Sequence, residues 1–103
     1  MKVDIIAAGI QLPPTAEAAI TRHAYFELSR FADNLRRITI RIFKEMTPPL
    51  GLDIACRVII DWPLLGPIEA ETRHSDPVLA ACNAVSRVGR SLACRLKIAN
   101  QRL

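Results

Sequence analysis

Two segments in the middle of the chain, 35–44 and 52–61, alternate between apolar and polar residues and constrain the fold more than any other feature. Successive side chains of a strand point to opposite faces, so each segment is expected to form a strand with one buried face. The expected buried residues are Ile38, Ile40, Ile42, Leu52, Ile54, Cys56, Val58 and Ile60. A sheet buried on both faces would instead show continuous apolar runs. The helices are therefore expected to cover one face only.

Two shorter segments are expected to complete the sheet. The N-terminal segment 2–8 has the composition of a short strand, and segment 68–73 alternates apolar or hydroxyl residues with charged ones. The connection 62–67 contains two prolines and a glycine and is expected to form a loop. Its Trp62 is expected to fold over the edge of the core, with contact to a partner as the alternative.

The two remaining segments have helical spacing. Segment 16–32 follows Thr15, a good N-cap, and its apolar residues recur every three or four positions. The stripe that they form consists of Ala16, Ile20, Ala24, Leu28 and Phe31. Asp76 followed by Pro77 is a strong start for a second helix, which is expected to reach about Ala99.

A rotation of about 100° per residue divides this second helix into an apolar and a basic side. The apolar side is expected to contain Val78, Ala81, Cys82, Val85, Val88, Leu92, Leu96 and Ala99. The opposite side is expected to carry Arg87, Arg90, Arg95, Lys97 and Arg102. Gly89 falls on the apolar side, where its lack of a side chain would let the helix approach the sheet closely.

The element order is β-α-β-β-β-α, which predicts an α+β two-layer sandwich with a four-stranded mixed sheet and both helices on one face. The first two strands flank a helix and are expected to run parallel through a right-handed crossover. Short connections predict that the last three strands form an antiparallel meander. With half of its 103 residues hydrophobic, the chain is expected to form a single domain over residues 1–103.

Positive charge is concentrated near the C-terminus. Residues 1–76 contain nine Lys and Arg against ten Asp and Glu, a net charge of −1, whereas residues 77–103 contain five cations and no acid, a net charge of +5. Such a segment indicates a polyanionic partner, nucleic acid in preference to an anionic membrane surface. The chain has no run of about 18 apolar residues and no signal-peptide pattern at its start, so a soluble cytoplasmic protein is expected.

No pattern predicts catalysis, a metal or a cofactor. Cys56, Cys82 and Cys94 lack the CxxC spacing of zinc sites, and the first two fall at core-facing positions, whereas the third is expected to be exposed. His23 and His74 have no ligands at suitable spacing and are expected to be surface or capping residues. We therefore expect no enzyme and no small-molecule substrate.

Two stretches together carry a resemblance that covers nearly the whole chain. The first comprises Ile10-Gln11-Leu12, the helix end 28–33 and the Ile-rich strand that follows. The second and more specific stretch comprises Gly66, the segment 68–71, and Asp76 leading into Ala80, Ala81, Val85, Arg87, Val88, Arg90 and Leu92. In this combination the chain resembles the short form of the ribosome hibernation-promoting factor and ribosome-associated inhibitor A family, also described as ribosomal subunit interface or sigma factor modulation proteins.

The resemblance implies a domain that lies in the small-subunit channel where messenger and transfer RNA bind. It also implies ribosome hibernation and inhibited translation under stress or in stationary phase, without catalysis and without the second, dimerising domain of longer members. The implied contacts to ribosomal RNA are Arg87, Arg90, Arg95, Lys97, Arg102, Arg22 and Arg30. The first helix departs from the family, in which it carries lysines, because His23, Ala24 and Glu27 stand near those places.

Two other functions are compatible with the sequence. A protein-interaction module, such as a transcription modulator, would use the same fold without binding ribosomes. A small enzyme would use the exposed sheet face, where Glu69 and Glu71 share a side, although salt partners such as Arg41 or Arg73 are the alternative explanation for these carboxylates. The same face also offers a second basic patch for RNA, consisting of Arg37, Arg41, Arg57 and Arg73.

Overall fold

The computed structural model describes residues 1–47, 51–63 and 65–101. Four strands, two long helices and one short 3-10 helix follow one another in these residues. Their bounds are β1 (Lys2–Ala8), α1 (Pro14–Leu28), η1 (Ser29–Phe31), β2 (Arg37–Thr47), β3 (Gly51–Trp62), β4 (Gly66–His74) and α2 (Pro77–Gln101). Within the described part of the chain, no helix is long and apolar enough to cross a membrane.

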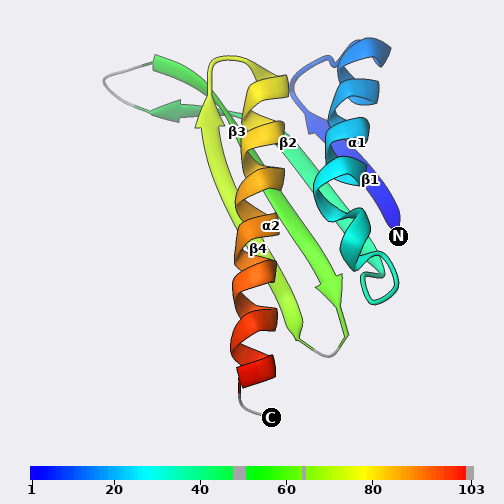
Figure 1. Ribbon diagram of the computed structural model, residues 1–103. Coiled ribbons are helices and arrows are strands. Elements are labelled where there is room, and N and C mark those ends of the chain that lie inside the picture. Colours follow the sequence, from blue (N-terminus) through cyan, green and yellow to red (C-terminus); the bar gives the residue numbers. More distant parts are fainter. Residues whose placement is uncertain (48–50, 64, 102–103) are drawn as a thin grey trace.

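The strands form one sheet in the order β1-β2-β3-β4, with β1 parallel to β2 and the other two pairings antiparallel. One register row crosses all four strands, because Ile40 pairs with Ile5 and Val58, and Val58 pairs with Ala70. Both helices lie on the same face of this sheet (Figure 1). The predicted two-layer α+β architecture is therefore confirmed.

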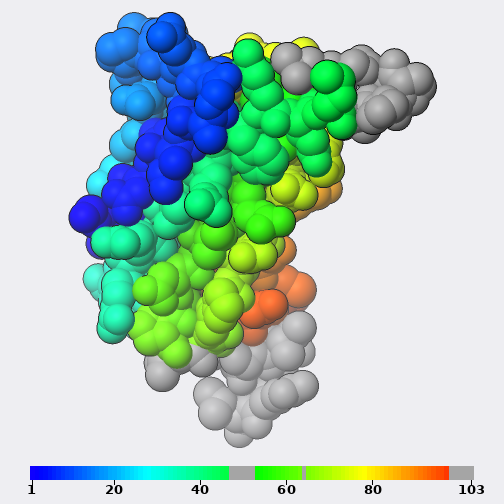
Figure 2. Space-filling model, turned by 180° about the vertical axis from the view of Figure 1, so that it is seen from behind, coloured from blue at the N-terminus to red at the C-terminus, as the bar shows by residue number. Residues whose placement is uncertain are grey.

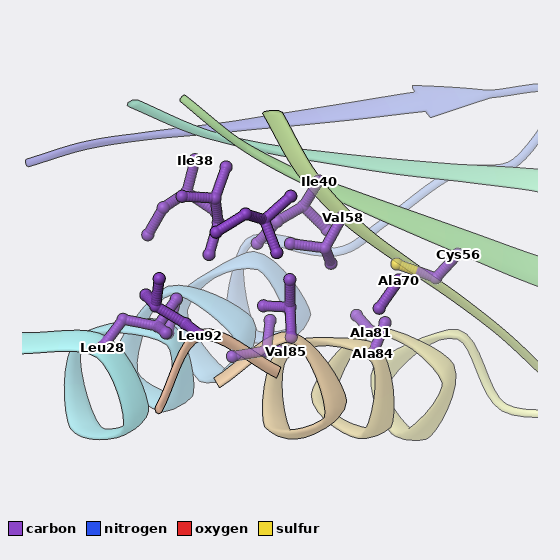
Figure 3. Close-up of a cluster of buried hydrophobic side chains, with 14 of the residues drawn as sticks. Leu28, Ile38, Ile40, Cys56, Val58, Ala70, Ala81, Ala84, Val85 and Leu92 are labelled. Carbon is purple, nitrogen blue, oxygen red and sulfur yellow. The ribbon is translucent and has the colours of Figure 1, made fainter. Parts of the chain in front are cut away.

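A single apolar layer joins the sheet to the helices. Leu28 of α1 and Val85 and Leu92 of α2 point toward the sheet, where they meet Ile40 and Val58 (Figure 3). All five side chains are fully buried. The apolar residues on one face of the strands and those of the two helix stripes thus meet in one layer, as predicted.

The start of α2 agrees with the sequence, but the bounds of α1 do not. The Asp76 carboxylate accepts hydrogen bonds from the backbone N–H groups of Val78 (2.8 Å) and Leu79 (3.5 Å), which confirms the predicted N-cap. The prediction of Thr15 as the N-cap of α1 is wrong, because the helix begins at Pro14 and Pro13 occupies the cap position without a side-chain hydrogen bond. Pro14, at the first helical position, has no N–H to satisfy and has a backbone angle suited to the first helical turn. It therefore takes the place of a capping side chain.

The second end of α1 also differs from the expectation. The α-helix ends at Leu28, and the chain continues as η1, in which Ala32 N–H donates to the carbonyl of Ser29 (3.0 Å). The tighter 3-10 turn still brings Phe31 into the core. The predicted apolar stripe therefore extends to Phe31, although the helix changes from α to 3-10.

Trp62 is the last residue of β3, and its side chain is only 4% exposed. Its ring packs edge-to-face on Phe31 with the ring centroids 6.1 Å apart. The prediction that this tryptophan covers the core edge is confirmed. The pairing of β3 with β4 continues beyond the apolar alternation as far as Trp62 and Gly66. The φ of Gly66 is 79°, a positive value that suits glycine.

Gly89 faces α1 rather than the sheet. A Cβ atom at this position would lie 3.6 Å from Leu28 Cδ2 and 3.8 Å from Glu27 Oε2. The glycine therefore belongs to the contact between the two helices, which corrects the expectation that it lets α2 approach the sheet.

The three cysteines occupy three different environments. Cys56 is buried in the core, and this burial raises the pKa of its thiol to about 12. Cys82 is partly buried, which also raises the pKa of its thiol, whereas Cys94 is exposed as predicted. The two core-facing thiols are thus held in their protonated, unreactive form at neutral pH.

Leu92→Ala is expected to lower the free energy of unfolding by about 2–5 kcal/mol, because it opens a cavity at the centre of the apolar layer. Denaturant unfolding followed by circular dichroism measures this loss. Leu79→Ala is the matched control on the same helix, because Leu79 is exposed, and it is expected to change stability by less than about 0.5 kcal/mol. Equal losses in the two variants would contradict the assignment of Leu92 to the core.

Gly89→Ala is expected to raise the free energy of unfolding by about 0.5–1 kcal/mol. Alanine favours the helix over the unfolded chain, and the added methyl group meets Leu28 at an ordinary van der Waals distance. The same denaturant measurement tests this gain. A destabilised alanine variant would mean that α1 and α2 are packed more closely at this point than the structure shows.

Candidate nucleic-acid interface

The outer side of α2 presents three of the predicted cations to solvent. Arg90 and Lys97 are separated by seven residues, about two turns, so they share one side of the helix. Arg87 lies toward β4, where its Nη1 donates a hydrogen bond to the main-chain oxygen of Glu71 (3.1 Å). All three side chains are exposed, and the helix contains no Asp or Glu. The cations of α2 are therefore not offset by acids of their own helix.

Two other predicted cations of the C-terminal segment, Arg95 and Arg102, do not belong to this group. Arg95 is exposed, but it follows the buried Val88 by seven residues and so projects toward the same side as that core residue. Arg95 is thus separated from Arg90 around the helix, contrary to the expected placement, and Arg102 lies outside the described residues.

The remaining two predicted cations are Arg22 on the exposed side of α1 and Arg30 in η1. Arg22 and Arg30 are both exposed, and Phe26 lies between them at a spacing of four residues from each. The first spacing places Arg22 and Phe26 on one side of α1, opposite the buried stripe that ends at Leu28, whereas Arg30 follows in η1 after the α-helix has ended. The ring of Phe26 is 79% exposed.

The two helices lie side by side, so that their outer sides form one surface. His23 Nε2 lies 2.9 Å from Ser86 Oγ, and Leu28 lies against Gly89 one turn farther along both helices. We use the name helix-layer surface for the exposed residues on the outer sides of the pair, namely Arg22, Phe26, Arg30, Arg87, Arg90 and Lys97.

The positions of α1 near which the resembling family carries lysines serve helix packing in this chain. Ala24 is completely buried, and His23 contacts Ser86 on α2. Glu27 lies beside Gly89, with its Oε1 atom 3.9 Å from His23 Nε2. These three residues therefore bind α1 to the rest of the protein and do not add cations to its outer side.

The exposed sheet face carries cations that are paired with carboxylates. This is the face seen from behind, uncovered by either helix (Figure 2). Arg37 lies 3.2 Å from Asp4, and Arg57 lies 3.8 Å from Glu71. Arg73 contacts both Glu71 and Glu45, and its hydrogen bond to Glu45 lowers the pKa of that carboxyl. The second basic patch considered above is thus largely neutralised, and the salt partner expected for Glu71 is confirmed in Arg73.

The histidines have structural contacts. His74 Nδ1 accepts a hydrogen bond from the backbone N–H of Asp76 (3.0 Å) just before α2, which confirms the expected capping role. His23 bridges the two helices. Among the described residues, no group of three or more His, Cys, Asp and Glu side chains is arranged to hold a metal ion.

Phe26 is the member of the helix-layer surface that sequence reasoning missed. The periodicity of α1 singles out residues on its buried side, and an aromatic residue off that stripe gives no periodic signal. The signal that was present is its flanking by two arginines, each four residues away.

No protein-family model and no curated protein matches this sequence. Solved structures do match it. A ribosomal subunit interface protein from Coxiella burnetii superposes with a TM-score of 0.74 at 13% identity, over 94% of this chain and 99% of that one. The N-terminal domain of Protein Y from Thermus thermophilus superposes with a TM-score of 0.64 at 14% identity, over 88% and 94% of the two chains. Both neighbours are of the hibernation-promoting factor family, so the resemblance drawn from the sequence is confirmed at the level of the fold.

Proposed function

We propose that this chain is a ribosome-associated translation inhibitor that binds the small ribosomal subunit and blocks the channel of messenger and transfer RNA. The observation that carries the proposal is the helix-layer surface, where exposed cations from two packed helices face solvent and α2 contributes no acid. The likeness of the fold to a ribosomal subunit interface protein supports a ribosomal partner.

The chemistry of this surface suits ribosomal RNA. Cations that neutralise phosphates release condensed counterions, which gives a favourable contribution that depends strongly on salt. Arginine adds planar, two-point hydrogen bonding to phosphate and can stack on exposed bases. Because Arg87, Arg90 and Lys97 project from a helix that is packed on the sheet along most of its length, binding requires little ordering of the protein backbone.

Binding in this proposal centres on the helix-layer surface and extends along α2. Arg87, Arg90 and Lys97 contact phosphates, together with Arg22 on α1 and Arg30 in η1. Arg95 and, beyond the described residues, Arg102 add contacts from the C-terminal end. One core joins β1 to α2 among the described residues, which supports the proposal that residues 1–103 form a single domain that occupies the channel without any chemical step.

The double variant Arg87→Glu/Arg90→Glu is expected to weaken binding to small ribosomal subunits at least tenfold while leaving the fold intact, because both side chains are exposed. Co-sedimentation with purified small subunits at several salt concentrations measures the affinity. Wild-type binding is expected to fall steeply with salt, and the double variant is expected to have a log–log slope smaller by about two.

Arg36→Glu/Arg41→Glu is the matched control, because it changes the net charge by the same amount at two exposed positions away from the helix-layer surface. It is expected to bind nearly as well as wild type, and circular dichroism checks that all variants fold. If the α2 variant sediments with subunits as wild type does, the basic side of α2 is not the binding surface. If wild type does not sediment even at low salt, the ribosomal role itself is refuted, and a protein-interaction role becomes the better explanation of the fold.

A further inference from the structure

Phe26 is the most exposed of the large hydrophobic side chains described on this protein, with 79% of its surface in contact with solvent. The interior side of α1 is already filled by Ile20, Ala24 and Leu28, and the side toward α2 is occupied by His23 and Glu27. The ring therefore has no place in the core of this fold and projects outward from a helix whose two other sides are committed to packing.

The immediate surroundings of the ring are cationic. Arg22 precedes it by four residues and so lies about 6 Å away along the axis of α1, whereas Arg30 follows it by four residues in η1. The guanidinium carbon of Arg30 lies 4.7 Å from the centroid of the Phe31 ring, which holds this cation close to the end of α1. Arg90 points outward from α2, which packs beside α1 at this level through Gly89.

The neighbouring aromatic residue shows that this arrangement is specific to one side of the helix. Tyr25 is also partly exposed, at 46%, but the residues four positions before and after it are Thr21 and Ser29. The two adjacent aromatic residues therefore differ in their neighbours along the chain, because cations stand four positions before and after Phe26 and hydroxyl residues stand at those positions around Tyr25.

We infer that Phe26 is a stacking platform for one unpaired base of ribosomal RNA, while Arg22 and Arg30 bind the phosphates on either side of that nucleotide. An aromatic ring offers a flat face to any base, and flanking cations hold the backbone, which is the arrangement by which proteins bind single-stranded nucleic acid. The inference rests on the proposed function and specifies how α1 takes part in it.

The charge around the ring favours RNA over a protein partner. A protein-docking site is expected to present a contiguous apolar patch with charged residues depleted at its centre. Here a single ring has Arg22 one turn before it on α1, Arg30 just beyond the end of that helix and Arg90 on the adjacent helix, and these cations complement a polyanion. One base with its two phosphates matches both the ring and the charges.

The test compares substitutions at Phe26 by their dissociation constants for purified small ribosomal subunits at fixed salt. Phe26→Ala is expected to weaken binding roughly 5- to 150-fold, the effect typical of losing one stacked base. Phe26→Trp is expected to bind as tightly as wild type, since it keeps an aromatic face. Phe26→Leu, which is apolar without such a face, is expected to bind as weakly as the alanine variant. Tyr25→Ala is the matched control and is expected to retain wild-type affinity.

Salt dependence separates this inference from the proposed function. Stacking releases no counterions, so Phe26→Ala is expected to keep the wild-type slope of affinity against salt, whereas Arg87→Glu/Arg90→Glu lowers that slope. Full binding by Phe26→Ala, beside weak binding by the arginine variant, would overturn the stacking platform and leave the ribosomal role standing. Full binding by Phe26→Leu with loss in Phe26→Ala would assign the ring to an apolar protein contact and overturn the inference. Failure of wild type to bind would overturn both.

Discussion

The apolar layer between one face of the sheet and the two helices is the contact on which every other feature of this protein depends. Because side chains such as Ile40 and Val58 all point to one face, burying them requires both helices on that face. The other face of the sheet is left to paired charges. The outer sides of the helices then become the remaining large surface, and the cations of α2 and α1 come together there.

The contact between α1 and α2 decides which side chains reach that surface. Gly89 and Ser86 allow α1 to lie directly against α2, with His23 and Glu27 turned into the seam between them. Side chains on that side of α1 are shielded from solvent, whereas those half a turn away point outward. The binding chemistry proposed for α1 is thus a consequence of helix packing, and it relies on arginine and an aromatic ring instead of a row of lysines.

Local patterning was sufficient to predict the architecture, because the strand period of two and the helix period of about 3.6 are direct consequences of backbone geometry. It failed where one residue overrides the pattern, as Pro14 does by starting α1 ahead of Thr15. Helical phase alone placed Gly89 on the apolar side but did not tell whether a strand or a helix lies opposite. Phe26 illustrates the same limit, since its exposure depends on which sides of α1 are already filled.

The low identity to the solved structures, 13% and 14%, follows from the same physics. A core tolerates many exchanges among apolar side chains as long as volume and pattern are kept, so a sequence can diverge widely without leaving the fold. Surface side chains are under no such constraint, so the outer sides of the helices can differ between chains that share this fold. A shared fold therefore does not decide whether this protein binds ribosomes. That depends on fewer than ten exposed side chains in the helix layer.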